Sequence, residues 1–163
     1  MGVKRTGPWS QTAKRLHTVE KRLAHAIHHA SVVNALGLVE AVQQGIVNQA
    51  PGGQAFVPLA PSTIARKASS KALIDSGVLI NAITHRVKDD KVFVGLLRGA
   101  RYKEGKELVN VGAIMEYGAT IKTKGKVRSI PARPFLAPVL HAERDKVYAR
   151  YREAIKKVMK GAK

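Results

Sequence analysis

The chain has 163 residues, of which 45% are hydrophobic, enough to bury a core within one domain. Its 29 lysines and arginines exceed its 11 acidic residues and give a formal charge of +18, so we expect contact with a polyanion or an acidic partner. The lack of cysteine excludes a disulfide framework, a thiolate zinc site and a cysteine nucleophile, and we identify neither a membrane span nor a signal peptide.

The first long element predicted is a helix over residues 10–50. Apolar residues recur there at helical spacing: Leu16, Val19, Leu23, Ile27 and Ala30. The sequence Pro51-Gly52-Gly53 predicts its end. Gly37 and Gly45 weaken the helix and leave one rod and two joined helices both open. A single rod would span roughly 60 Å, so part of it would project or pack on a neighbour.

Short elements follow in the middle of the chain. Residues 62–67 predict a short helix that begins at Pro61 or Ser62, and residues 78–82 predict one or two helical turns. Alternating apolar residues over 83–88 and 92–96 predict a β-hairpin.

Two basic loops and two helices are predicted for the rest. Residues 97–109 form a basic loop or an extended hairpin, and residues 111–118 form a short helix that ends at a glycine. Residues 122–128 form the second basic loop, and the last helix starts at Phe135. This order favours an α+β fold: a small antiparallel β-sheet flanked by long N-terminal and C-terminal helices, with protruding basic loops.

We divide the chain into an N-terminal helical region, residues 1–50, and an α+β region, residues 51–163, packed as one unit. Residues 31–60 contain no lysine or arginine and one acid, Glu40. The chain is therefore expected to offer two kinds of surface, one neutral and apolar and the other basic. The simpler alternative is that residues 31–60 form core and the charged remainder is solvated.

Candidate catalytic and metal sites are weak. His25, His28 and His29 share a helix face, but they lack a nearby carboxylate, and exposed or interface histidines explain them better. Asp75, Ser76 and His85 could be imagined as a hydrolytic triad, but no nucleophile elbow supports it. We expect no enzyme activity, no cofactor and no metal.

Four segments in this order resemble the tail-completion and neck proteins of tailed bacteriophages, the phage virion morphogenesis or minor tail protein family. They are residues 58–67 (PLAPSTIARK), 73–83 (LIDSGVLINAI), 113–119 (AIMEYGA) and 130–136 (IPARPFL). Met115 stands where the family often has histidine.

The resemblance implies a virion structural protein that completes the tail or joins head and tail as a ring in the neck, with six copies expected. Its implied partners are itself, the tail tube or tail terminator, the head–tail connector and phage DNA in the channel, with no membrane. The implied location is the tail or neck of the virion, assembled in the host cytoplasm. The alternative is a non-specific DNA-binding protein of phage or nucleoid type, which explains the charge but not the ordered motifs.

Two sets of site residues follow. The expected contacts with subunits or neighbours are Leu73, Ile74, Gly77, Leu79, Ile83, Glu116, Tyr117, Gly118, Arg133 and Phe135. The residues expected to face the channel or a polyanion are Arg98, Arg101, Lys103, Lys106, Lys122, Lys124, Lys126 and Arg128.

Arg133 lies between two prolines that hold it extended, so we expect a bidentate contact with a carboxylate. Glu116 is the candidate, either within the subunit or across to the next. The alternative is that Arg133 points into water.

Overall fold

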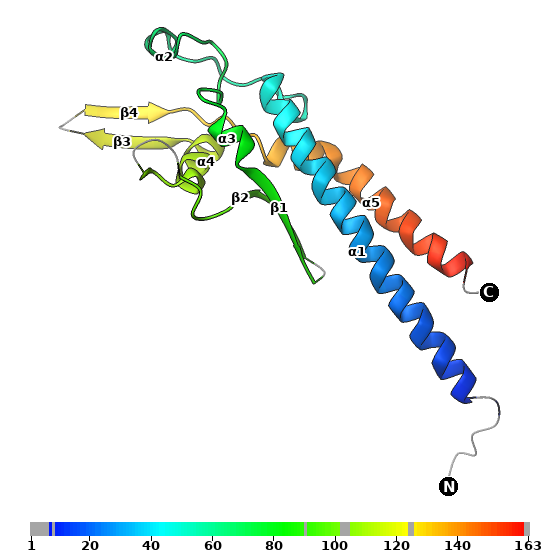
Figure 1. The fold of residues 1–163 in the computed structure, drawn as a ribbon. Coiled ribbons are helices and arrows are strands. Elements are labelled where there is room, and N and C mark those ends of the chain that lie inside the picture. Colours follow the sequence, from blue (N-terminus) through cyan, green and yellow to red (C-terminus); the bar gives the residue numbers. More distant parts are fainter. Residues whose placement is uncertain (1–6, 8, 90, 102–104, 124–125, 162–163) are drawn as a thin grey trace.

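The computed structural model describes residues 7, 9–89, 91–101, 105–123 and 126–161. In chain order its elements are α1 (Trp9–Val47), a 3-10 turn η1 (Pro51–Gly53), α2 (Pro61–Lys67), α3 (Val78–Asn81), β1 (Ile83–Lys88), β2 (Lys91–Leu96), α4 (Leu108–Tyr117), β3 (Ala119–Thr123), β4 (Lys126–Ile130) and α5 (Ala137–Lys160). The α+β class is confirmed (Figure 1). In detail, the strands form two separate two-stranded antiparallel sheets, β1–β2 and β3–β4, where we expected one small sheet.

Helix α1 is one continuous rod, which decides between the two readings of its glycines. Its 39 residues span about 60 Å. A Cβ at Gly37 would lie 3.5 Å from Nη1 of Arg150, and one at Gly45 would lie 2.7 Å from Cα of Pro51. Gly45 therefore allows the close approach of Pro51, whereas a side chain at Gly37 would make only ordinary contact with Arg150. The packing of α1 in the fold outweighs the low helix propensity of both glycines.

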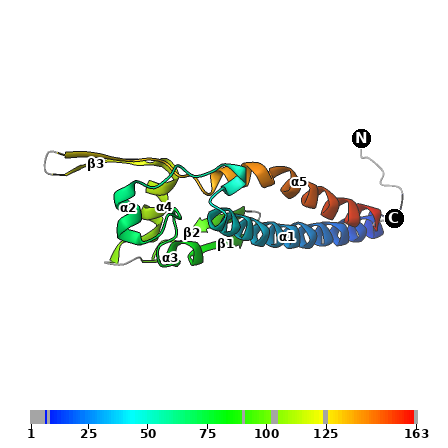
Figure 2. The same ribbon diagram turned by 90° about the horizontal axis from the view of Figure 1, so that it is seen from above.

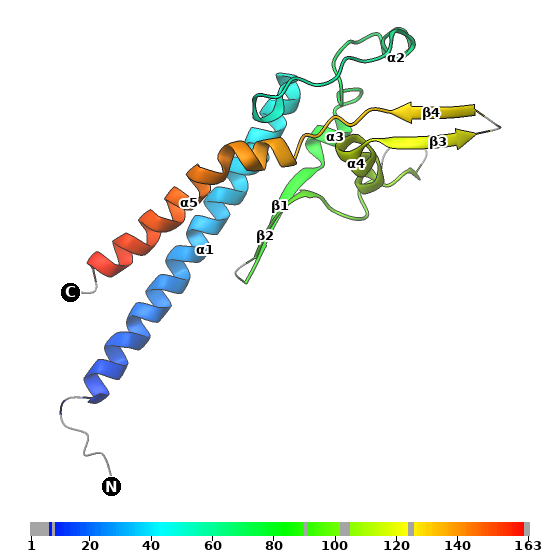
Figure 3. The same ribbon diagram turned by 180° about the vertical axis from the view of Figure 1, so that it is seen from behind.

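Helices α1 and α5 lie side by side and run in opposite directions (Figures 1 and 3). Polar groups bridge them in the seam: the hydroxyls of Ser31 and Tyr151 are 2.9 Å apart. Arg150 donates to Oδ1 of Asn34 at 3.1 Å, and Nδ2 of Asn34 donates to the carbonyl of Val147 at 3.3 Å. Because Ser31 and Asn34 are buried, these bonds satisfy groups that would otherwise destabilise the pair.

Replacing Tyr151 with phenylalanine removes the bond to Ser31 and is expected to cost about 1 kcal/mol of unfolding free energy. Urea unfolding measures this as a shift of the midpoint at constant slope. Tyr148→Phe is the matched control, since that tyrosine is 56% exposed on the same helix. Equal midpoints for the two variants would contradict the role of the seam bond.

The N-terminal part of α1 extends past the end of α5 (Figure 1). We expected that part of a single helix of this length would project in this way. Arg22 donates to the carbonyl of Gly161 at 3.0 Å, at the end of the shared seam. Beyond it, Leu16 is 66% exposed and Trp9 57% exposed. We name α5 and the part of α1 beside and beyond it the arm.

Helix α1 is long and apolar enough to cross a membrane by length and composition, with a mean hydropathy of 1.3 over an 18-residue window. From the sequence we expected no membrane span. Of that window, 44% is buried inside the subunit. Contacts with α5, β1 and β2 bury part of α1, and one helix of this length and composition is weak evidence for a membrane span.

The hydrophobic core lies where α1, β1 and the start of α5 meet. It is formed by Val42, Ile46, Ile83, Phe135 and Val139. Residues of α3, β2 and α4 pack around this cluster, among them Ile80, Leu96 and Met115. The core therefore joins the arm to the smaller elements.

The β3–β4 hairpin projects at the end of the molecule opposite the arm (Figure 2). In its register Ile121 pairs with Arg128 and Lys122 with Val127. Directly paired residues share a face, and successive residues alternate, so Ile121 and Val127 lie on opposite faces. Ile121 is 43% exposed and Val127 64% exposed, so both faces of the hairpin are open in the subunit.

Candidate functional site

Glu116 joins the end of α4 to the start of α5. Its carboxylate accepts hydrogen bonds from the backbone N–H groups of Phe135 at 2.8 Å, Leu136 at 3.0 Å and Ala137 at 2.9 Å. The first N–H groups of a helix have no partner within the helix, and a negative charge there is favourable. Glu116 is only 8% exposed, so it acts as a buried cap supplied from a distant segment.

Arg133 holds the loop before α2. Its guanidinium donates from Nε to the carbonyl of Val57 at 2.7 Å and from Nη2 to the carbonyl of Pro58 at 2.8 Å. Its backbone N–H donates to the carbonyl of Met115 at 2.6 Å. Burial lowers the pKa of Arg133 from its ordinary value.

The expected pairing of Arg133 with Glu116 is therefore wrong within the subunit. The two residues are close in the fold, but Glu116 is occupied by the amides of α5 and Arg133 by two loop carbonyls. The physical reason is that a helix start and a loop each offer unpaired backbone groups, which the residue pattern does not display. The alternative that Arg133 points into water is also wrong, because it is 6% exposed.

A groove of about 1830 Å³ lies between α2, α4 and the β3–β4 hairpin. Apolar side chains line it, namely Leu73, Leu79, Val111, Met115, Ile121 and Ile130. Its charged side chains are Arg66, Lys67, Lys106, Arg128 and Arg133, against one acid, Asp75. All four segments that carry the family resemblance contribute to its lining, a convergence that the sequence order alone did not indicate.

Positive charge is concentrated in this groove. Burial lowers the pKa of Lys67, Asp75 opposes that shift, and the nearby Arg133 and Arg66 lower it further. Nζ of Lys67 donates to the carbonyl of Lys71 at 2.8 Å. Because cations crowd one another here, a carboxylate placed in the groove would be favoured.

The residues expected at subunit contacts divide into two groups. Leu73, Gly77, Leu79 and Arg133 line the groove, although Leu79 and Arg133 are themselves buried. Tyr117 is not part of the lining and is 82% exposed. Ile83, Phe135 and Glu116 are buried in the subunit, so they stabilise its fold instead of offering an exposed surface. Ile74 packs on the core, and Gly118 ends α4 with a φ of 75°.

The residues expected to face a polyanion are spread over two regions. Arg98, Arg101, Lys106, Lys122 and Arg128 are exposed, and Lys106 and Arg128 also line the groove. Lys103, Lys124 and the side chain of Lys126 lie outside the described residues. The segment 122–128, expected as a loop, is largely the paired end of the β3–β4 hairpin.

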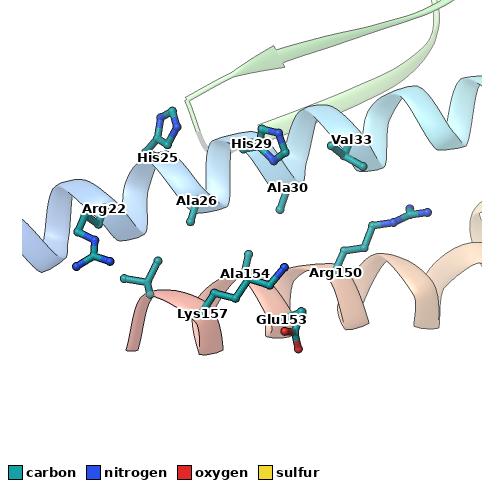
Figure 4. A pocket seen from close by; sticks show the side chains of 11 residues that line it. Arg22, His25, Ala26, His29, Ala30, Val33, Arg150, Glu153, Ala154 and Lys157 are labelled. Atoms are coloured by element: carbon teal, nitrogen blue, oxygen red, sulfur yellow. The ribbon is translucent and has the colours of Figure 1, made fainter. Parts of the chain in front are cut away.

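A smaller cavity of about 580 Å³ lies in the seam of the arm. Figure 4 shows Ala26, Ala30 and Ala154 directed into the space between the helices, while His25 points away from α5. His25, His28 and His29 are all exposed on α1. Among the described residues there is no group of three or more His, Cys, Asp or Glu side chains placed to hold a metal ion.

The family of this chain follows from a comparison of its sequence with models of known protein families. A family model described as the phage virion morphogenesis family matches residues 10–156. The chain belongs to the phage virion morphogenesis family. This membership supports a structural or assembly role in a phage virion. No curated protein and no solved structure matches the chain.

Proposed function

We propose that this member of the phage virion morphogenesis family completes the tail, or joins it to the head, as part of an oligomeric ring in the neck. The observation that carries the proposal is the family match, which spans α1 to α5. The shape supports it, because the arm and the β3–β4 hairpin offer different surfaces at opposite ends (Figure 2). A subunit between two unlike neighbours needs two such surfaces. The role is structural and requires no catalytic residue.

In this proposal six copies close a ring between the tail tube or tail terminator and the head–tail connector, assembled in the host cytoplasm. Exposed cations such as Arg98, Arg101 and Lys122 face the DNA that passes through the channel. Their attraction for phosphates reads no sequence, so DNA can slide. It acts over about 8 Å at physiological salt, which suits a narrow channel.

Deleting the gene from its phage tests this function. We expect filled heads and separate tails in the lysate, seen by negative-stain imaging, and a fall in infectious particles of at least a hundredfold. A plasmid copy of the gene should restore joined particles, and the protein should co-purify with them. Normal, infectious particles formed without the protein would contradict the proposal.

The charge of +18 favours a second candidate, a non-specific DNA-binding protein. Such a protein would bind duplex DNA tightly on its own and would lose affinity steeply as salt rises. Measuring DNA retention at two salt concentrations separates the two functions. Tight binding by a monomer or dimer that is absent from particles would favour the DNA-binding candidate.

A further inference from the structure

One face of α1 carries an exposed stripe without any cation. Val33, Leu36, Glu40, Gln44 and Val47 recur at steps of three or four residues, and all five are exposed. Val33, Leu36 and Val47 are 38%, 52% and 44% exposed. Residues at this spacing form one helix face. We name these five residues the α1 stripe.

The α1 stripe belongs to the segment where copies of this chain repel one another least. Residues 31–60 contain Glu40 and no lysine or arginine, in a chain of charge +18. Any contact between two copies brings like charges together, which is costly unless one side lacks cations. The α1 stripe itself carries no cation and offers apolar area. Arg150 of α5, which lines the seam cavity together with Val33, donates to Asn34.

The groove has the complementary properties. Five cations and one acid line it, together with the apolar side chains of α4 and the hairpin. Arg66 and Arg128 are exposed, so they can reach a carboxylate on an incoming helix. Ile121, on the groove face of the hairpin, is 43% exposed and has apolar area to cover.

We propose that the α1 stripe of one subunit lies in the groove of the next subunit. Leu36 and the flanking valines cover the apolar floor, and Glu40 meets Arg66 and Arg128 at the rim. This is helix-in-groove recognition, in which anchors at helical spacing fill one side of a helix. The inference rests on the proposed function, since it names the contact through which copies form the ring.

A contact between the α1 stripe and the groove is compatible with a ring. The α1 stripe and the groove are different surfaces of one molecule, so the contact is heterologous and each subunit can bind one neighbour on each side. An isologous pairing of two α1 stripes would leave the cationic groove open and would end at a dimer. An acidic segment of another protein could also enter the groove, and the experiment below separates these outcomes.

Cysteine cross-linking tests the contact, because the natural chain has no cysteine to interfere. Two single variants, Leu36→Cys and Ile121→Cys, are mixed and treated with a short thiol cross-linker, both as purified protein and in assembled particles. We expect cross-linked dimers from the mixture and from neither variant alone. The double variant should give a ladder of higher oligomers.

Val127→Cys is the matched control, since Val127 is 64% exposed on the opposite face of the same hairpin. It should not cross-link to Leu36→Cys. Cross-linking of Leu36→Cys to itself would show α1–α1 pairing and overturn the proposal. The proposal would also be overturned if neither purified protein nor particles gave a Leu36–Ile121 product. An equal yield of cross-linked dimer from Leu36→Cys with Val127→Cys and with Ile121→Cys would overturn it as well.

Charge reversal gives a second readout. Glu40→Arg and Arg66→Glu should each raise the dissociation constant for self-association at least tenfold, and the two changes together should restore most of it. Loss without restoration would overturn the pairing of Glu40 with Arg66. The gene deletion above tests the proposed function separately. If deletion leaves heads and tails unjoined but no Leu36–Ile121 product forms, only this contact is refuted. If deletion still gives joined particles, only the proposed function is refuted.

Discussion

Replacing Glu116 with alanine should destabilise the fold by about 3 kcal/mol or more, because each buried donor left without a partner costs about 1–3 kcal/mol. Three backbone N–H groups at the start of α5 lose their acceptor together. Domains of this size are stable by only about 5–15 kcal/mol, so the loss is a large fraction of the total. Glu116→Gln keeps one acceptor oxygen and should lose roughly half as much.

Urea unfolding of the wild type and the two Glu116 variants measures this effect. Glu20→Ala is the control: its carboxylate pairs with His17 at 3.3 Å on the exposed part of α1, and exposed pairs contribute about 0–1 kcal/mol. If Glu116→Ala unfolded at the same urea concentration as Glu20→Ala, the capping role would be refuted. The order wild type, glutamine, alanine is expected.

Local signals in the sequence placed the helices and the β1–β2 hairpin within a few residues, but not the β3–β4 pairing, where a loop was expected. The apolar periodicity of α1 and the stop at Pro51 placed the first helix within a few residues. Gly77 and Gly118 have φ values of 77° and 75°, a backbone conformation that residues with side chains rarely adopt. These features depend on neighbouring residues, which a sequence displays directly.

Whether α1 is one rod or two could not be predicted, because it depends on distant contacts. Gly45 lowers helix propensity, but its missing side chain leaves room for the backbone of Pro51, where the chain turns back. The gain from packing α5 along α1 exceeds the roughly 1 kcal/mol that a glycine costs in a helix. Sequence spacing carries no information about which segment fills that space.

The groove could not be predicted from the sequence either, because it also depends on contacts between distant segments. The motifs at residues 58–67 and 130–136 could be recognised singly, but nothing in their order indicated that they line one groove. Arg133 shows the limit best. The flanking prolines led us to expect an extended arginine in contact with a carboxylate, whereas its partners are main-chain carbonyls, which every residue possesses.

Replacing Arg133 with alanine should cost about 2–3 kcal/mol of unfolding free energy, since hydrogen bonds from a charged donor contribute about 1.5–3 kcal/mol. The loop at Val57 and Pro58 loses its link to the segment before α5. Arg133→Lys should recover only part of the loss, because an ammonium group lacks the planar fork that reaches two carbonyls at once.

Two measurements distinguish this role from a contact with a neighbouring subunit. The thermal midpoint of the isolated protein should fall for Arg133→Ala, and limited proteolysis should cut the loop at residues 54–60 faster. Arg98→Ala, an exposed arginine outside the groove, should change neither. An unchanged midpoint together with failed assembly would instead assign Arg133 to a contact between subunits. The loop carries one wall of the groove, so loss of the Arg133 link should also weaken the binding of the α1 stripe.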